Sequence, residues 1–439
     1  MEKILHVAGA GLAGCEAAWQ AANRGIRVRL YEMKPTKYSA AHSSDKFAEL
    51  ICSNSFKAAR VESAAGLLKE EMRHMGSLMT ACADKAGVPA GGALAVDRDV
   101  FSDLVTEAVE AHPNIEVIRR ELTEIPGGTA VIATGPLSSD AIAEKIQQSF
   151  GDALSFFDAA APIVTADSID MEKCFVSSRY DRGEADYINC PFDKVGYEEF
   201  ADALLTARRA ELHGVDVQNP KVYEGCMPIE ILMQRGRDAP RFGPMKPVGL
   251  TDPKTGRRPW AAVQLRAENR EKTMYNLVGF QTNLRFPEQK RVFAMIPGLE
   301  NAAYVRYGVM HRNTFLNSPG ILTKGYSAVK RENLFFAGQI TGVEGYMESA
   351  SSGLLAGINA ARYLDGRPPL ILPATTMTGA LADYISGYQG KSFQPMGANF
   401  GMLPALSEQI RDKRLRYAAL SKRGLEDLDA VLLTEGEVG

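Results

Sequence analysis

The chain has 439 residues, a hydrophobic share of 45%, and 50 Lys and Arg against 53 Asp and Glu, which gives a formal net charge of −3. This length and composition predict a globular protein of two or three domains, and the charge excludes a global basic field for nucleic acid while leaving room for a local basic patch. No apolar stretch approaches the ~18 residues that a membrane helix needs. The first residues lack the layout of a signal peptide, so we expect a cytoplasmic location and no membrane contact.

The chain opens with a pattern typical of a βαβ unit. Residues 4–8 predict a short buried strand, and residues 12–23 predict an alanine-rich helix that stops at Gly25. Residues 26–32 alternate between apolar and polar side chains, as a second strand does. This is the context in which a glycine-rich turn binds a dinucleotide.

The turn between the first strand and the helix carries Gly9, Gly11 and Gly14 with the GxGxxG spacing. In this motif one glycine permits the tight turn, one lets the backbone approach a pyrophosphate, and one lets helix and strand pack closely. The helix N-terminus then offers free N–H groups to the phosphates. Glu32 ends the second strand, where a carboxylate accepts hydrogen bonds from a ribose diol.

Further along the chain the pattern changes twice. We expect a long loop with short helical turns over 36–60, a helix over 62–86, a strand over 129–135, a helix over 197–212, a strand over 334–337 and a helix over 350–364. From about residue 162 the runs are shorter and rich in Pro and Gly. We therefore predict an α/β fold with a discontinuous Rossmann-like domain, residues 1–160 and 305–439, and an inserted α+β domain, residues 161–304.

Two further segments favour FAD over NAD alone as the ligand of the Rossmann-like domain. Thr134 and Gly135 end a strand that resembles the Ala-Thr-Gly strand of glutathione-reductase-type flavoproteins. Gly338 and Gln339 resemble the segment of those proteins that meets the ribityl and phosphate part of the flavin. A helix that starts near Glu348 would point its positive end at the reduced flavin. An NAD-only Rossmann enzyme is the rival interpretation.

The segment over 337–350, AGQITGVEGYMESA, resembles the signature of the TrmFO (Gid) family, the folate- and FAD-dependent tRNA (uracil-5-)-methyltransferases. Segments over 47–55, 223–230 and 279–284 resemble other parts of that family, so the resemblance covers nearly the whole chain. The related GidA/MnmG flavoproteins share the two FAD-binding ends but carry a further helical region at the C-terminus. This chain ends about 75 residues after its glycine-rich helix, which favours TrmFO.

The resemblance implies methylation of C5 of a T-loop uridine, position 54 in tRNA numbering. The one-carbon unit would come from 5,10-methylenetetrahydrofolate, the hydride from reduced FAD, and the electrons for the flavin from NADH or NADPH. A thiolate that adds to C6 makes C5 nucleophilic, and a base then removes the C5 proton.

Particular residues match the family's functional positions. Cys226 resembles the nucleophile, and Cys52 resembles the cysteine beside the flavin that acts as the base or holds the flavin site in shape. Tyr346 and His311 resemble the folate-stacking residues, with Phe286 a weaker candidate. The competing interpretation is structural in each case: a buried thiol, a core aromatic ring or a satisfied histidine.

The six cysteines, at positions 15, 52, 82, 174, 190 and 226, are widely scattered, which argues against a disulfide framework or a metal site. Apart from Cys52 and Cys226 we expect them to be structural.

A tRNA partner needs positive charge, and residues 235–291 supply it. This basic segment holds thirteen Lys and Arg against five Asp and Glu, a local net charge of +8. A basic face of this kind fits contacts with the phosphates of the T-arm, whereas a silent solvated surface is the alternative. A flavin oxidoreductase acting on a small molecule, or a non-catalytic FAD-bearing subunit, are the rival functions. The oligomeric state stays open, with a monomer among the options.

Overall fold

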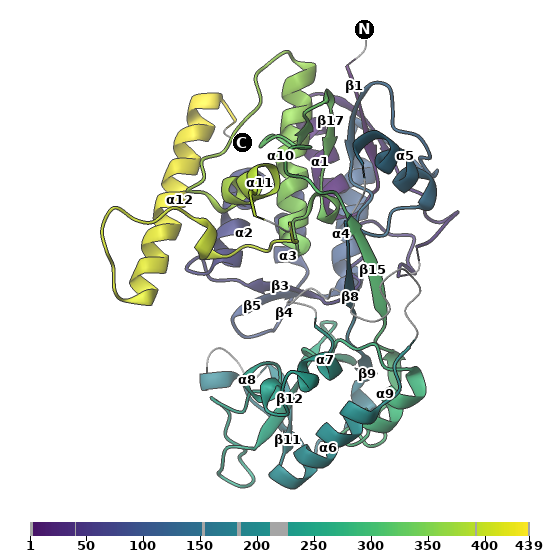
Figure 1. The fold of residues 1–439 in the computed structure, drawn as a ribbon, viewed down its shortest axis with the longest axis vertical. Helices are drawn as coiled ribbons and strands as arrows, with labels where there is room; N and C mark the ends of the chain where they lie inside the picture. Colours follow the sequence, from purple (N-terminus) through teal and green to yellow (C-terminus); the bar gives the residue numbers. More distant parts are fainter. Residues whose placement is uncertain are drawn as a thin grey trace.

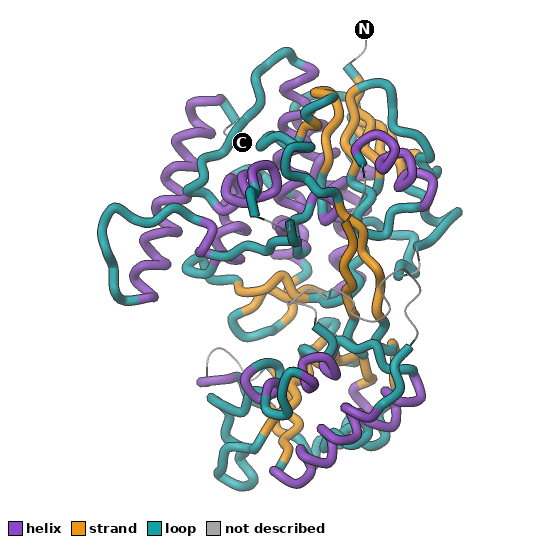
Figure 2. Tube along the Cα trace, in the orientation of Figure 1, coloured by secondary structure: helices purple, strands orange, loops and turns teal. Residues whose placement is uncertain are grey.

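The computed structural model describes residues 3–39, 41–151, 154–181, 186–210, 227–390 and 393–437, without the side chains of 154–159, 181 and 311–314. The protein has two parts, each built around a six-stranded sheet, and a two-stranded ribbon of β8 (Leu154–Ala159) and β15 (Met310–Phe315) runs between them (Figure 1). Figure 2 shows that most of the helical segments lie in the part of the protein that contains both chain termini.

The first sheet has the order β16-β17-β7-β1-β2-β6, and every neighbouring pair except β16–β17 is parallel. Its strands are β1 (Ile4–Ala8), β2 (Arg27–Tyr31), β6 (Ile115–Ile118), β7 (Thr129–Ile132), β16 (Ser327–Ala328) and β17 (Arg331–Phe336). The near-continuous apolar runs in β1, β7 and the end of β17 suit a parallel sheet that is covered on both faces. Strands from both ends of the chain therefore lie side by side, as the sequence predicts.

Helices α1 (Leu12–Asn23) and α10 (Tyr346–Leu364) pack closely against each other on this sheet. A Cβ atom on Gly353 would lie 2.1 Å from the carbonyl oxygen of Ala13, and one on Gly357 would lie 2.4 Å from that of Ala17. Only glycines permit this approach, which explains the small residues of both helices. The sequence predicts α1 with its observed bounds, whereas α10 begins four residues earlier than expected.

The other helices of the first part are α2 (Ala64–His74), α3 (Leu78–Lys85), α4 (Arg98–Ala111), α5 (Asp140–Phe150), α11 (Met377–Gly387) and α12 (Lys413–Glu435). The single helix expected over 62–86 is wrong, because Gly76 takes a left-handed φ of +68° and Ser77 caps a new helix through the Thr80 amide. Strands β3 (Ser55–Ala58), β4 (Gly87–Val88) and β5 (Ala93–Val96) form a small third sheet. Strand β3 lies within residues 36–60, where the sequence predicts a loop with short helical turns.

The second part has an antiparallel sheet with the order β10-β11-β12-β13-β9-β14. Its strands are β9 (Ile163–Thr165), β10 (Phe175–Val176), β11 (Tyr187–Phe192), β12 (Ala261–Ala267), β13 (Met274–Leu277) and β14 (Tyr304–Arg306), and its helices are α6 (Lys194–Thr206), α7 (Ile229–Gln234), α8 (Ala239–Phe242) and α9 (Phe286–Phe293). Helix α6 is shorter than the expected 197–212. It begins where the Asp193 side chain caps the Gly196 amide, and it ends because Ala207 is extended.

One face of the second sheet packs on its own apolar core, and the other face meets the first part of the protein. On the second face, Arg266 Nε donates to Asn54 Oδ1 at 3.0 Å, and its Nη2 donates to Ser53 Oγ at 2.9 Å. The Tyr187 hydroxyl donates to the Ala90 carbonyl at 3.1 Å. This contact places the loop over 50–54 between the two parts. Among the helices within the described ranges, none is both long and apolar enough to cross a bilayer.

Candidate functional site

A cavity of about 420 Å³ lies between the turn over 9–14 and the distal segment over 337–350, the two glycine-rich segments of the chain, and is lined by both of them. Its volume falls within the ~300–1,000 Å³ typical of small-molecule sites. Nine of the predicted site residues line it: Gly9, Gly11, Glu32, Cys52, Thr134, Gly135, Gly338, Gln339 and Tyr346.

The three glycines of the first segment solve three different steric problems. Gly9 has a φ of +95°, and a Cβ there would lie 2.6 Å from the Ala133 carbonyl oxygen. Gly14 does not line the cavity, and a Cβ on it would lie 1.8 Å from the Gly9 carbonyl oxygen. Gly11 faces open space, with nothing within 4 Å of its Cβ position, and no side chain caps α1. The uncapped N–H groups of α1 therefore face the cavity, ready for an anion.

Glu32 is buried at the end of β2 and fixes the glycine turn. Its Oε2 accepts a hydrogen bond from the Ala10 amide and its Oε1 accepts one from the Lys34 amide, each at 2.9 Å. Each carboxylate oxygen can accept a second hydrogen bond. Glu32 can therefore hold the loop and still bind a diol in the cavity.

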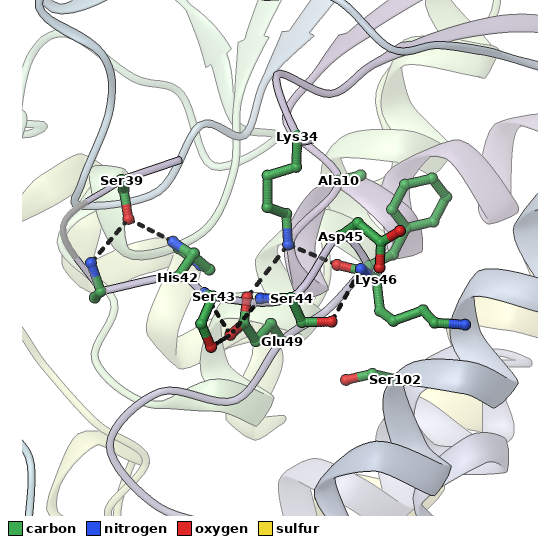
Figure 3. Close-up of polar contacts among 12 residues, drawn as sticks. Ala10, Lys34, Ser39, His42, Ser43, Ser44, Asp45, Lys46, Glu49 and Ser102 are labelled. Carbon is green, nitrogen blue, oxygen red and sulfur yellow. Dashed lines mark hydrogen bonds and ion pairs between the residues drawn. The ribbon is translucent and has the colours of Figure 1, made fainter. Parts of the chain in front are cut away.

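Beside Glu32, the buried Lys34 side chain ties down the loop that follows (Figure 3). Its Nζ donates to the Lys46 carbonyl at 2.6 Å and lies 3.4 Å from Glu49 Oε2. The other oxygen of Glu49 accepts hydrogen bonds from the amides of Ser43 and Ser44. His42 lines the same end of the cavity, and burial together with Lys34 lowers its pKa. A neutral imidazole in this position can accept as well as donate a hydrogen bond.

The opposite end of the cavity is formed by the start of α10. Gly345 precedes it with a φ of +124°, and no side chain caps the helix. Glu348 in the first turn is buried, pairs with Lys57 Nζ at 2.6 Å and accepts a hydrogen bond from the Ala398 amide at 3.0 Å. Gln339 is held in place because its Nε2 donates to Glu344 at 2.9 Å. A second uncapped helix N-terminus thus faces the same cavity.

Between these ends, Cys52 and Tyr346 touch. The Tyr346 hydroxyl oxygen lies 2.9 Å from the Cys52 amide nitrogen and 3.1 Å from its Sγ. Because that oxygen accepts the amide hydrogen, the phenol proton is free to point at the sulfur. Burial, and then the charge of Cys52, raise the pKa of Tyr346 well above its ordinary value, so the phenol keeps its proton. Tyr346 can therefore donate a hydrogen bond to the Cys52 sulfur.

Arg98 holds the Cys52 loop from the other side. Its guanidinium pairs with the buried Glu268 and donates to the carbonyl oxygens of Leu50 and Ile51. Burial lowers the pKa of Arg98, but the charge of Glu268 and its hydrogen bond to the guanidinium together have the larger effect and raise that pKa. The loop carrying Cys52 is thus fixed between α4 and the second sheet.

Besides Gly14, three predicted residues are not among those that line this cavity, and two of these three lie at least in part outside the described residues. Phe286 is 51% exposed at the start of α9 and stacks on Tyr307 with ring centroids 4.7 Å apart. His311 lies on β15, opposite Asp158 of β8, and its side chain is outside the described part of the structure. Cys226 lies outside the described residues.

Sequence reasoning missed several polar residues that line the cavity, namely Lys34, His42, Glu49 and Lys57. Lys34 was within reach of prediction, since it follows Glu32 by two residues at the end of β2. No local pattern marks Lys57, whose partner Glu348 lies 291 positions away in the chain.

The other described cysteines are buried and carry no site. Burial raises the pKa of Cys82 to about 11. Cys174 and Cys190 face each other with their sulfurs 3.5 Å apart in the second core.

The basic segment over 235–291 is mostly at the surface. Ten of its thirteen cations are exposed: Arg235, Arg237, Lys254, Arg257, Arg258, Arg270, Lys272, Arg285, Lys290 and Arg291. Arg266 is the buried exception, because it binds the loop over 50–54.

Comparison with known proteins supports the family resemblance. The family model of glucose inhibited division protein A matches residues 4–368. A methylenetetrahydrofolate–tRNA-(uracil-5-)-methyltransferase TrmFO from Lactiplantibacillus plantarum is 57% identical over 97% of this chain and 96% of its own. The protein of that name from Pelotomaculum thermopropionicum is 58% identical over 97% of this chain and 98% of its own.

The structure of Aquifex aeolicus GidA superposes with a TM-score of 0.67 at 17% identity, covering 98% of this chain and 75% of that one. Together with the parallel sheet, this similarity confirms the predicted Rossmann-like α/β fold class. The match to the family model and the two full-length relatives together show that this chain belongs to the glucose inhibited division protein A family, in its TrmFO branch.

Proposed function

We propose that this protein methylates C5 of a T-loop uridine in tRNA, position 54, with 5,10-methylenetetrahydrofolate as the one-carbon donor. The observation that carries the proposal is the contact between Cys52 and Tyr346 at the wall of a cavity that both glycine-rich segments line. A half-buried thiol in contact with a phenol hydroxyl suits proton removal from a pyrimidine. A site that only binds a dinucleotide would not require this thiol.

The residues of the cavity fit FAD. Gly11 leaves open space before the uncapped start of α1, which suits a pyrophosphate, and Glu32 has free acceptor capacity for a ribose. Gly338, Gln339 and the uncapped start of α10 would hold the flavin end, and Thr134 and Gly135 would border the dinucleotide. When bound and reduced by NADH or NADPH, FAD supplies the hydride that completes the methyl group.

Cys52 and Cys226 divide the work on the uracil. A thiolate of Cys226 adds to C6, and its electron pair forms the S–C6 bond while the C5=C6 π electrons move toward C5 and the C4 oxygen. Once C5 has taken the one-carbon unit, Cys52 accepts the C5 proton, and tetrahydrofolate leaves with the electron pair of its C–N bond to give an exocyclic methylene. After this methylene has accepted a hydride, the Cys226 thiolate leaves from C6 and the C5=C6 bond is restored. The Tyr346 hydroxyl stabilises the Cys52 thiolate before that transfer. His311, Tyr346 and the exposed Phe286 are the proposed folate-stacking residues.

The start of α7 supports the assignment of Cys226, which lies three residues before it. The Ile229 amide donates to the Gln281 carbonyl at 2.8 Å, and Gln281 lines the cavity. The buried Glu230 accepts hydrogen bonds from Thr282 Oγ1 at 2.9 Å and the Asn283 amide at 2.7 Å. Three extended residues span ~11 Å at most. The start of α7 is thus anchored to a residue of the cavity lining, three positions after Cys226 in the chain.

The remaining elements of the proposal concern partners and organisation. The exposed cations of the basic segment would contact the phosphates of the T-arm. We propose residues 1–160 and 305–439 as the FAD-binding domain, residues 161–304 as the tRNA-facing domain, and the cytoplasm, where tRNA is found, as the location.

The test is transfer of radiolabel from methylenetetrahydrofolate to an unmodified tRNA transcript by the yellow, FAD-loaded protein with NADH or NADPH. We expect label at position 54, and none with Cys226→Ala. An RNA stem-loop with 5-fluorouridine should be trapped covalently by the wild type and not by Cys226→Ala. The matched control is Cys82→Ala, which removes a buried thiol outside the cavity and should keep both activities.

Each outcome separates the rival functions. NAD(P)H oxidation without transfer of label to RNA would identify a small-molecule oxidoreductase. Binding of FAD and tRNA without transfer or trapping would identify a non-catalytic subunit. Normal trapping by Cys226→Ala would overturn the assignment of the nucleophile.

A further inference from the structure

Buried polar side-chain atoms without a hydrogen-bond partner are concentrated in one place in the second sheet. Six such atoms occur among the described residues, and five of them belong to three neighbouring strands. They are Thr165 Oγ1 on β9, Asn276 Nδ2 on β13, and Tyr304 Oη, Arg306 Nε and Arg306 Nη2 on β14. Buried polar groups are normally paired, so such a cluster calls for an explanation.

The strand register places four of these five atoms on the same face. Asn276 and Arg306 both lie directly opposite Ile163, on either side of β9. Thr165 follows Ile163 by two residues and therefore points to the same face. Arg266 lies opposite Asn276 on this face, where it binds Asn54 and Ser53. The cluster of Thr165, Asn276 and Arg306 thus lies on the same sheet face as Arg266, which binds the loop over 50–54. None of the three residues is among those that line the cavity.

A β-bulge in β14 aims Arg306 at this face. Tyr304 lies opposite Val164, yet Arg306 lies opposite the adjacent Ile163, so β14 holds one extra residue between them. Val305 takes up the extra position and is 50% exposed. Tyr304 consequently points to the core side, where it stacks on Tyr307, and Arg306 points to the opposite side. Bulges beside active sites commonly re-aim a side chain in this way.

The charges that act on Arg306 are those of the Cys52 region. Burial and the nearby Arg98 lower the pKa of Arg306 to about 10, whereas Glu268, Tyr346 and Cys52 raise it. The Glu268 carboxylate is already paired with Arg98, so it does not neutralise Arg306. Two guanidinium nitrogens of Arg306, the amide NH₂ of Asn276 and the hydroxyl of Thr165 are left as buried donors without an acceptor.

We propose that Arg306, Asn276 and Thr165 form a subsite for an anionic oxygen of the substrate, the C4 oxygen of the target uracil. This inference rests on the proposed function. When a thiolate adds to C6, the C5=C6 π electrons pass to the C5–C4 bond and negative charge gathers on the C4 oxygen. The charge returns to the ring when C5 is alkylated, so the step needs no oxidant or reductant. C4 is bonded to C5, whose proton Cys52 would accept, and the subsite lies on the sheet face that meets the loop carrying Cys52. Donors held in place for such a charge stabilise the transition state.

The test compares Arg306→Met and Arg306→Lys with wild type in label transfer to the tRNA transcript, using FAD-loaded protein. We expect Arg306→Met to lower kcat by roughly 10²- to 10³-fold, as loss of an oxyanion donor does, with KM for tRNA and folate within about threefold of wild type. Arg306→Lys keeps the charge but not the planar fork and should lose at least about tenfold. FAD content and the rate of flavin reduction by NAD(P)H should be unchanged in both. The matched control is Tyr304→Phe, which removes the unpaired hydroxyl on the other face and should keep wild-type kcat.

Two results would overturn the inference. Wild-type kcat in Arg306→Lys, or in folded Arg306→Met, removes the subsite from the reaction. A raised KM for folate at unchanged kcat assigns the guanidinium to a carboxylate of the folate tail instead. If the wild type itself transfers no label, both the proposed function and this inference are wrong. If the wild type and the variants at position 306 transfer label equally well, only this inference is wrong.

Discussion

The hydroxyl oxygen of Tyr346 lies 3.1 Å from the sulfur of Cys52, although 294 positions separate the two residues in the chain. The start of α10 and the loop after β2 are brought together by the first sheet and by the packing of α1 on α10. Without the sheet and this helix packing, the two side chains would not be in contact. The contact joins the Cys52 thiol to a hydroxyl from the distal glycine-rich segment.

Tyr346→Phe should therefore slow methylation. A hydrogen bond to a charged group contributes ~1.5–3 kcal/mol, so loss of the phenol donor should lower kcat by about 10- to 100-fold. Without this donor the Cys52 thiolate is less stable, so the rising limb of the pH–rate profile should move to higher pH. Tyr384→Phe is the control, since its hydroxyl donates to the Gln394 carbonyl elsewhere. A Tyr346→Phe profile that coincides with wild type would refute the role of the phenol.

Gly353→Ala should separate the two helices that frame the cavity. The new Cβ would lie 2.1 Å from the Ala13 carbonyl oxygen, so α10 must shift. Overpacking of this kind destabilises by ~1–3 kcal/mol, and we expect a lower melting temperature with reduced FAD occupancy, read from absorbance of the bound flavin. Gly387→Ala at the end of α11 is the matched control, because its Cβ position is open. Equal melting temperatures for the two variants would contradict the close packing.

Stability should depend on pH through Glu71, a buried carboxyl on α2. Its two oxygens accept hydrogen bonds from the Met377 and Thr378 amides at the start of α11. Burial raises the pKa of Glu71 from 4.5 to about 7, against the effect of those hydrogen bonds. The folded state thus binds the proton more tightly than the unfolded state does. The stability from this group is complete below pH 4.5 and is lost as the pH rises through about 7.

Glu71→Gln should remove this dependence. As the pH rises from about 5 to about 7.5, the denaturation midpoint of the wild type should decrease relative to that of the variant. The corresponding difference in unfolding free energy should be at most about 3 kcal/mol. Parallel curves for the two proteins over that range would refute the role of Glu71.

The basic segment should set the salt dependence of tRNA binding. Arg258→Ala and Lys290→Ala each remove an exposed cation. If each cation contacts one phosphate, the slope of log K against log salt should become less steep by about 1 per variant, measured by filter binding. Lys422→Ala on α12, 77% exposed and paired with Glu426, serves as the control. An unchanged slope in the first two variants would show that tRNA binds at another surface of the protein.

Local patterns were sufficient for the first βαβ unit. Gly9, Gly11 and Gly14 fixed the turn, and the alternation over 26–32 gave β2 to within a residue at each end. Such features depend on backbone sterics and on burial within one short segment. Of the nine predicted residues that line the cavity, Gly9, Gly11 and Glu32 came from this reasoning, and the other six came from resemblance to known flavoprotein families.

Apart from the local break at Gly76, what sequence reasoning missed depends on distant partners. The apolar pattern over 62–86 continues through Gly76, so the break between α2 and α3 has to come from the turn there. The Arg306 side chain changes face because of a bulge that only the pairing of β14 with β9 reveals. The Glu71 carboxyl has no local signal at all, since its partners Met377 and Thr378 lie over 300 positions away.

The pairing of α1 with α10 also constrains biosynthesis. Helix α1 emerges from the ribosome more than 300 residues before α10. At about 5–20 residues per second, the apolar face of α1 stays uncovered for roughly 20–60 s. During that interval the nascent chain can hold no complete flavin site and exposes surface that chaperones recognise. A complete flavin site can therefore form only after α10 has emerged, late in synthesis, and truncation before α10 should yield aggregated rather than merely inactive protein.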